Sequence, residues 1–174
     1  MIYLIISTII DILLSTNITN TYKDINYFFP LILITSIPIS YILTKNKTIF
    51  LILIILIGII YDLLYSDIIL INVYFLVLQT LLINQYYKKN KPNIINIITL
   101  STLGLITYDL YISLILILTK YQTITIKDII YKETHSIIIN IIYLTISLIV
   151  LKSRILRNKK SLNKWTKYIK YSRW

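Results

Sequence analysis

Residues 49–83 read IFLILIILIGIIYDLLYSDIILINVYFLVLQTLLI, 35 almost wholly apolar positions interrupted chiefly by the polar residues from Tyr61 to Asp67. A helix of about 20 residues crosses the roughly 30 Å hydrocarbon layer of a membrane, so this stretch is long enough to cross it twice. The polar residues predict a reversal near Tyr65-Ser66-Asp67. They also include Asp62, which comes just before the reversal, where neither lipid nor the dipole of its own helix favours a negative charge. The stretch therefore predicts a pair of membrane helices with an acid of functional interest near their turn.

The composition of the whole chain indicates the same class of protein. Hydrophobic residues make up 57% of the sequence and the mean hydropathy is +0.76, above the range of ordinary soluble domains. Runs of isoleucine favour strands in water, but in lipid each segment must satisfy its own backbone hydrogen bonds, which favours helices. There is no cysteine, which excludes disulfides and thiolate metal sites. We therefore predict an all-α integral membrane protein.

Apolar segments long enough to act as membrane spans occur six times. They lie at about 2–17, 27–44, 48–64, 68–86, 94–118 and 136–152. A cleaved signal peptide is the weaker interpretation of the first segment, because no positive residue precedes it and Asp11 interrupts it. Pro38 predicts a bend in the second. The chain thus divides into a six-helix transmembrane domain, 1–152, and a cytoplasmic tail, 153–174.

The lysines and arginines predict the orientation of these spans. Positive residues are retained on the cytoplasmic side, and six spans would place 14 of the 18 on one side of the membrane. Those 14 are Lys45, Lys47, Lys88, Lys89, Lys91 and nine residues between Lys152 and Arg173; the other side receives Lys23, Lys120, Lys127 and Lys132. Both termini are therefore expected in the cytoplasm. The net charge of +11 describes a membrane-facing basic surface more simply than a nucleic-acid site.

The tail, 153–174, combines basic residues with apolar residues at helical spacing. The apolar residues are Ile155, Leu162, Trp165 and Ile169. One face of such a helix enters the headgroup region while the other meets anionic lipid. The pattern predicts an amphipathic segment on the membrane surface; a docking site for a cytoplasmic protein is the alternative.

Three acids fall inside the predicted spans: Asp11, Asp62 and Asp109. All three lie on helices that run outward, in the middle or outer half of the membrane. A charged side chain there costs about 2.5–3.5 kcal/mol on insertion scales, so it faces a bundle interior, a cavity or a partner. Every Lys and Arg lies in a loop or at a span boundary. The acids are therefore either protonated or hydrogen-bonded packing residues, or contacts for a basic group of another protein.

Two spacing patterns accompany these acids. Ser7, Asp11 and Ser15 are four residues apart and form a polar stripe suited to facing other helices. The only two glycines each precede an acid, in GIIYDL from Gly58 and GLITYDL from Gly104. Small residues allow close helix approach beneath each acid. The repetition of the Gly…Tyr-Asp-Leu pattern indicates either a duplicated hairpin or coincidence.

At these residues the chain resembles MreD, the small membrane subunit of the rod-shape (elongasome) system. The family carries a G-x-x-x-D element in its third helix, matched by Gly58 and Asp62 in GIIYDLLYSD, and an asparagine in its last span, matched by Asn140 in HSIIINIIYLTISLIV. Length, six spans and a proline-bearing second helix agree over nearly the whole chain. The match is incomplete, because a Gly-Phe before the element is absent and the Leu-Gly after it reads Leu70-Ile71.

The resemblance implies a non-enzymatic scaffold in the bacterial cytoplasmic membrane, with a bundle like that of the S components of energy-coupling-factor importers. It would bind MreC and couple MreB filaments to the RodA and penicillin-binding-protein machinery of lateral peptidoglycan synthesis. The candidate interface residues are Gly58 and Asp62, followed by Asp109 and Asn140. No cofactor is expected.

Two other classes of function were weighed. In an importer S component, polar groups near the midplane would bind a vitamin or ion, but such subunits carry an alanine-rich docking pattern on the first helix and this chain has no alanine. A membrane enzyme needs convergent catalytic groups or a metal set. The lone His135, beside Glu133, reads as a loop residue, so we expect neither catalysis nor a metal site.

Overall fold

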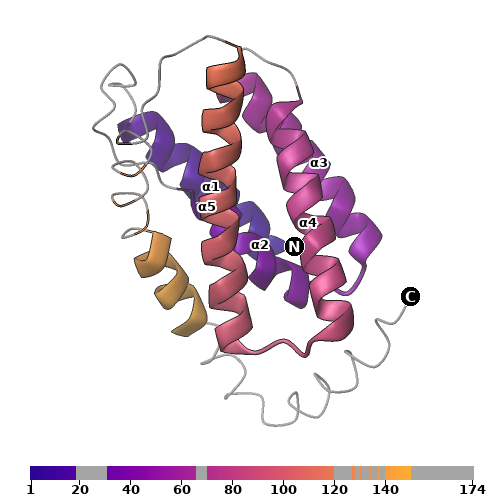
Figure 1. Ribbon diagram of the computed structural model, residues 1–174. Coiled ribbons are helices and arrows are strands. Elements are labelled where there is room, and N and C mark those ends of the chain that lie inside the picture. The colour runs from indigo at the N-terminus through magenta and orange to yellow at the C-terminus, as the bar shows by residue number, and fades with distance from the viewer. Residues whose placement is uncertain are drawn as a thin grey trace.

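The computed structural model describes residues 1–18, 31–65, 70–119 and 140–149, and four single positions between 127 and 137. The described chain is all-helical, as predicted, with six helices and no strand (Figure 1). They are α1 (Ile2–Ile18), α2 (Ile32–Leu43), α3 (Lys47–Tyr65), α4 (Ile71–Lys89), α5 (Ile94–Leu118) and a sixth helix whose described part is Asn140–Ile149. Within the predicted spans, residues 27–30, 68–69, 136, 138–139 and 150–152 lie outside the described residues, as does the predicted tail, 153–174.

The second helix is the centre of the bundle. It packs against α1, α4 and α5, and every residue from Ile32 to Tyr41 is buried (Figure 1). A helix enclosed in this way has no face exposed to solvent or lipid, and its buried hydroxyls at Thr35 and Ser36 donate to carbonyl oxygens of α2 itself. The most extensive helix pair is α3 with α4, which run side by side as a hairpin. Its core includes Phe50, Ile54 and Leu76, all 2% exposed or less.

Pro38 lies inside α2, where its ring displaces a backbone hydrogen bond of the preceding turn. The hydroxyl of Ser101, on α5, donates to the carbonyl oxygen of Thr35 at 2.9 Å. A neighbouring helix therefore supplies a donor to the turn that precedes the proline. The carbonyl that loses its helical donor at Pro38 is that of Ile34, so this bond ties α5 to the same turn and does not replace the lost one.

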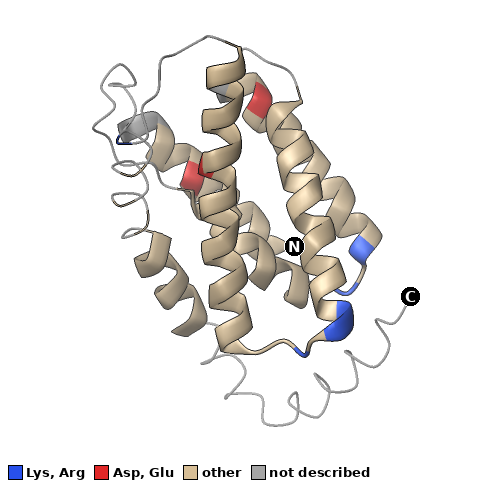
Figure 2. Cartoon of the chain, in the orientation of Figure 1, with Lys and Arg blue, Asp and Glu red and all other residues tan. Residues whose placement is uncertain are grey.

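The lysines of the α2–α3 and α4–α5 connections gather at one end of the bundle (Figure 2). The Tyr41 hydroxyl on α2 donates to Asn84 Oδ1 on α4 at 2.6 Å, which brings the two helix ends together. Lys47 Nζ donates to the Thr44 carbonyl at 2.8 Å, and the Met1 amino group donates to Thr44 Oγ1 at 3.3 Å. The first residue and both lysine-bearing connections therefore lie at the same end of the bundle.

Two helices are long and apolar enough to cross a membrane by length and composition. Their candidate spans are Lys47–Leu64 and Ile94–Ile115. α4 is more polar, and the apolar stretches described in the other helices are shorter. Large apolar side chains are exposed on the outward faces, for example Ile52, Leu56 and Leu63 of α3. These features suggest a membrane protein; the arrangement of six passes stays a prediction.

Candidate functional site

The first component of the site is a carboxylate of one helix placed at the start of the next. Asp11 lies in the middle of α1 and is 1% exposed. Its Oδ1 accepts the backbone N–H of Ile32, the first residue of α2, at 2.9 Å, and its Oδ2 accepts the hydroxyl of Tyr61 from α3. The first N–H groups of a helix have no partner within the helix and form the positive end of its dipole, which favours a carboxylate there.

The sixth helix contributes a second group to the same helix start. Asn140 is fully buried, and its Oδ1 accepts the backbone N–H of Leu31 at 3.1 Å. Leu31 is the N-cap residue of α2 and provides no side-chain cap of its own. Side chains from α1 and from the sixth helix thus accept the first N–H groups of α2, for which the N-cap residue of α2 provides no acceptor.

Asp62 caps the N-terminus of α4, as Asp11 caps the N-terminus of α2. It is 4% exposed, and its Oδ1 accepts both the backbone N–H of Asn72 at 2.8 Å and the side-chain Nδ2 of Asn72 at 3.0 Å. Its Oδ2 accepts the backbone N–H of Val73 at 3.4 Å. The carboxylate near the end of α3 therefore caps the helix that follows it in the chain.

This geometry changes the interpretation of the α3–α4 turn. From the sequence alone Asp62 is misplaced, because the dipole of the helix that carries it disfavours a negative charge near its end. The N-cap residue is Leu70, which has no side-chain cap and a left-handed backbone with φ of 73°. Ser66 and Asp67 lie outside the described residues.

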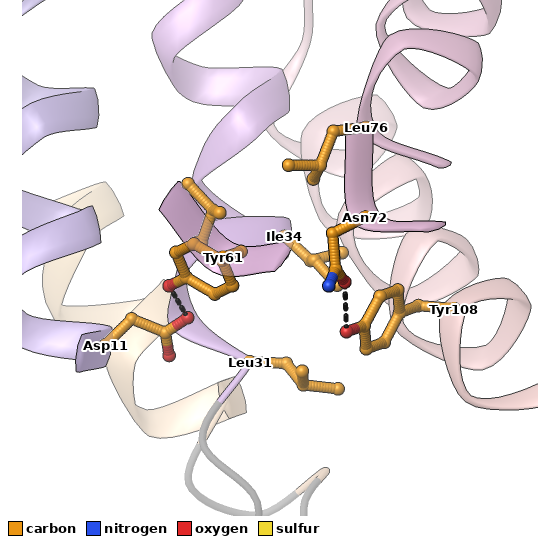
Figure 3. A pocket seen from close by; sticks show the side chains of 8 residues that line it. Asp11, Leu31, Ile34, Tyr61, Asn72, Leu76 and Tyr108 are labelled. Atoms are coloured by element: carbon orange, nitrogen blue, oxygen red, sulfur yellow. Dashed lines mark hydrogen bonds between the residues drawn. The ribbon is translucent and has the colours of Figure 1, made fainter. Parts of the chain in front are cut away.

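Asn72 links the second cap to α5. Its Oδ1 accepts the hydroxyl of Tyr108 at 2.8 Å, and the ring of Tyr108 packs edge-on against Phe75 with centroids 5.0 Å apart. Tyr61 and Tyr108 each precede an acid in sequence; Tyr61 donates to the capping carboxylate of Asp11, whereas Tyr108 donates to Asn72, the residue that Asp62 caps (Figure 3). The two Gly…Tyr-Asp segments therefore place their tyrosines on different kinds of acceptor, and their origin as a duplicated hairpin stays a prediction.

The two glycines lie at close helix contacts, as their position beneath the acids predicted. A Cβ on Gly58 would lie 2.7 Å from the Cα of Val73 on α4. A Cβ on Gly104 would lie 2.1 Å from the side-chain nitrogen of Gln79 on α4. A Cβ at position 58 would collide with the backbone of α4, which cannot move aside as a side chain can. Glycine therefore lets α3 approach α4 closely enough for Asp62 to reach the first N–H groups of α4.

All four candidate interface residues lie inside the bundle. Gly58 is buried beside α4, Asp62 and Asn140 cap helices, and Asp109 on α5 is 1% exposed. The stripe of Ser7, Asp11 and Ser15 is buried as well, which confirms that it faces other helices. A role of the four residues in binding a partner stays a prediction.

Tyr61, Asn72 and Tyr108 belong to the site but are not among the residues predicted from the sequence. The available signal was the Tyr-Asp pair that occurs at both echoed segments, and a lone asparagine in an otherwise apolar run ten residues after Asp62. Among the described residues, no group of His, Cys, Asp or Glu side chains could hold a metal ion. The site therefore consists of carboxylate, amide and phenol groups that hydrogen-bond mainly to the ends of neighbouring helices.

No protein-family model, curated protein or solved structure matches this chain.

Proposed function

We propose that the chain is a non-enzymatic membrane scaffold of the cell-shape machinery, related to MreD, in the bacterial cytoplasmic membrane. In this proposal it spans the membrane six times, binds a single-span partner like MreC, and helps couple MreB filaments to the RodA and penicillin-binding-protein complex. The motif around Gly58 and Asp62 and the asparagine at 140 support the relationship.

The observation that carries the scaffold proposal is that the buried acids Asp11 and Asp62 bind helix N-termini of the same chain. Many transporters aim the N-termini of broken helices at an anionic substrate. Here the N-termini of α2 and α4 already receive the chain's own Asp11 and Asp62. Groups arranged in this way hold helices in place, which favours a structural role over an importer subunit that binds a small molecule.

The proposed role of the candidate interface residues follows from their burial. Gly58 and Asp62 fix the α3–α4 hairpin, and we propose that its outward side chains, such as Leu56 and Leu63, contact the partner helix. Leu56 and Leu63 are 51% and 79% exposed. Asp109 and Asn140 would position α5 and the sixth helix in the same manner.

The basic end of the bundle is proposed to face the cytoplasm. Lys45, Lys47 and the lysines at 88, 89 and 91 would then lie near anionic headgroups and on the filament side. The tail 153–174 would extend this surface along the membrane.

The decisive experiment is depletion of the protein in its host, combined with co-purification of an MreC-like partner. The proposal expects rod cells to become round and the partner to be recovered with the wild-type chain. Rod-shaped depleted cells, or loss of uptake of a nutrient, would contradict it, and a small molecule retained by the purified protein would favour the importer alternative.

A set of three variants separates direct contact from positioning. Leu63→Trp, a bulkier apolar side chain on the exposed face, should reduce partner recovery without lowering the stability of the isolated protein, because it places no charge in the membrane. Asp62→Ala should reduce both, and Asp62→Asn should retain more of each because an amide oxygen still accepts the α4 N–H groups. Equal partner recovery from Leu63→Trp and wild type would exclude this face of α3.

A further inference from the structure

The outward stripe of α4 changes from apolar to polar before the helix ends. Positions 74, 78, 81, 82, 85, 88 and 89 are all exposed, and their spacing of three and four places them on one face of the helix. The first four are Tyr74, Leu78, Leu81 and Leu82, and the last three are Gln85, Lys88 and Lys89. The polar part, from beyond Leu82 to Lys89, covers about 10 Å of the helix.

The neighbouring helices carry exposed isoleucines at this level. Both α3 and α5 begin at the end of the bundle where α4 finishes (Figure 1). Ile49 of α3 is 43% exposed, and Ile94 and Ile95 of α5 are 48% and 67% exposed. The exposed Thr99 of α5 donates its hydroxyl to the Ile95 carbonyl at 3.0 Å. Apolar surface therefore reaches within about 3 Å of the helix end on α3 and α5, but stops about 10 Å short of it on α4.

We propose that the polar end of this stripe, formed by Gln85, Lys88 and Lys89, binds the headgroup of an anionic phospholipid. Exposed amide and ammonium groups are costly in hydrocarbon, so the headgroup region has to reach them. The headgroup then lies about 7 Å deeper beside α4 than beside α3 and α5. This inference rests on the membrane placement in the proposed function, and it names the kind of lipid that the basic end binds.

The chemistry of the three side chains suits a phosphate group. The two ammonium groups donate hydrogen bonds and accept none, and the amide of Gln85 can donate two. Each lysine near a membrane surface attracts anionic lipid. None of the acids among the described residues is exposed, and those seen in Figure 2 lie away from the lysine-bearing end. No described carboxylate therefore competes with the phosphate for this surface.

Lys47, at the same end, is not part of this surface. Its Nζ donates to the Thr44 carbonyl at 2.8 Å and lies 3.8 Å from the centroid of the Tyr41 ring. The Tyr41 ring in turn stacks on Tyr87, with centroids 6.1 Å apart. These contacts tie the ends of α2, α3 and α4 together, so the exposed Lys88 extends from a fixed backbone.

The depth of the headgroup can be measured with nitroxide labels on single cysteines, because the natural chain has no cysteine. Gln85→Cys and Ile98→Cys each lie four residues from the helix end at the α4–α5 connection, and Leu56→Cys lies in the middle of α3. The whole chain is placed in vesicles of phosphatidylcholine and phosphatidylglycerol. Electron paramagnetic resonance then measures collisions with oxygen, which concentrates in hydrocarbon, and with a nickel chelate, which stays in water.

The proposal expects the chelate to reach the label at position 85, and oxygen to dominate at positions 98 and 56. Equal immersion of positions 85 and 98, with position 56 in hydrocarbon, would overturn the deeper headgroup and leave the membrane placement intact. A label at position 56 that collides with the chelate would overturn the membrane placement itself, and this proposal with it.

The identity of the lipid is tested by binding of phosphatidylglycerol to the whole chain in a neutral detergent. Replacing both Lys88 and Lys89 by Gln should weaken binding about tenfold or more, whereas replacing both by Arg should keep it within about threefold. The matched control replaces Lys45 and Lys91 by Gln, which removes two charges from the same end but not from α4. It should weaken binding by less than about threefold.

Three results would overturn the lipid site. Equal weakening by the two pairs of Gln substitutions would mean that the whole end attracts anions by charge alone. Equal binding of phosphatidylcholine would remove the requirement for an anionic headgroup. Displacement of the lipid by an equal concentration of inorganic phosphate would assign the surface to a free anion. The basic tail, 153–174, is present in every variant, so its contribution is the same in each comparison.

Discussion

The carboxylate of Asp62, in the last turn of α3, accepts the backbone N–H of Asn72, the second residue of α4, at 2.8 Å. The same carboxylate binds the Asn72 side chain and the N–H of Val73. An acid that opposes the dipole of its own helix thus complements the dipole of the next helix. The hairpin and the start of α4 depend on one side chain.

Asp62→Ala should therefore destabilise the protein by about 2–3 kcal/mol, because it leaves buried N–H groups of Asn72 and Val73 without an acceptor. Reversible unfolding in mixed micelles measures the effect. Leu63→Ala is the control on the same helix: Leu63 is 79% exposed, so its change should stay within about 0.5 kcal/mol. Equal stability of Asp62→Ala and wild type would exclude the capping role.

The two glycines should differ in their tolerance of alanine. A Cβ at position 58 meets the backbone of Val73, whereas a Cβ at position 104 meets the flexible end of the Gln79 side chain. We expect Gly58→Ala to cost about 1–3 kcal/mol and Gly104→Ala less, because Gln79 can move aside. The same unfolding assay ranks the two variants, and the reverse order would contradict the close α3–α4 approach.

Leu70→Gly should stabilise the protein. Leu70 has a φ of 73°, a left-handed conformation that costs a residue with a Cβ about 1–2 kcal/mol. Glycine removes this cost but loses more conformational freedom on folding, about 0.5–1 kcal/mol. The expected net gain is about 0.5–1 kcal/mol in the free energy of unfolding. Because Leu70 is 56% exposed, little packing is lost; a destabilised variant would show that its side chain contributes more than its backbone costs.

The predicted orientation can be measured with single cysteines, because the natural chain has none. Cysteines replacing Lys45 and Lys91 should react with a membrane-impermeant thiol reagent only after the cytoplasmic side is opened. A cysteine replacing Lys127 should react in intact cells. Labelling of positions 45 and 91 from opposite sides would contradict an even number of crossings between them.

Hydropathy predicted the helices well because it is a local property. The segments at 2–17, 48–64 and 94–118 correspond to Ile2–Ile18, Lys47–Tyr65 and Ile94–Leu118 in the structure. The fourth, predicted at 68–86, runs from Ile71 to Lys89. Its start depends on the Asp62 carboxylate and on the left-handed turn at Leu70, and neither feature belongs to the periodicity of the helix itself.

The composition of the site was less predictable because its contacts join distant parts of the chain. The acids, the glycines and Asn140 could be selected from their position inside apolar segments, and the close approach at the glycines followed from their size. The partners could not be selected, since Asp11 meets Tyr61 50 positions further on, and no local pattern encodes that pairing. The donors to Asp11 and Asp62 include backbone N–H groups at helix starts, and a backbone N–H carries no charge that would mark it in the sequence.

The bond from Leu31 N–H to Asn140 has a consequence for biogenesis. It joins positions 109 residues apart, so in the proposed six-span arrangement the ribosome makes the acceptor long after the donor has entered the insertion machinery. Until Asn140 has been synthesised, the Leu31 N–H group lacks the acceptor that it has in the folded protein. We expect chains stalled before residue 140 to remain associated with the insertase, and release to begin once the final segment has emerged.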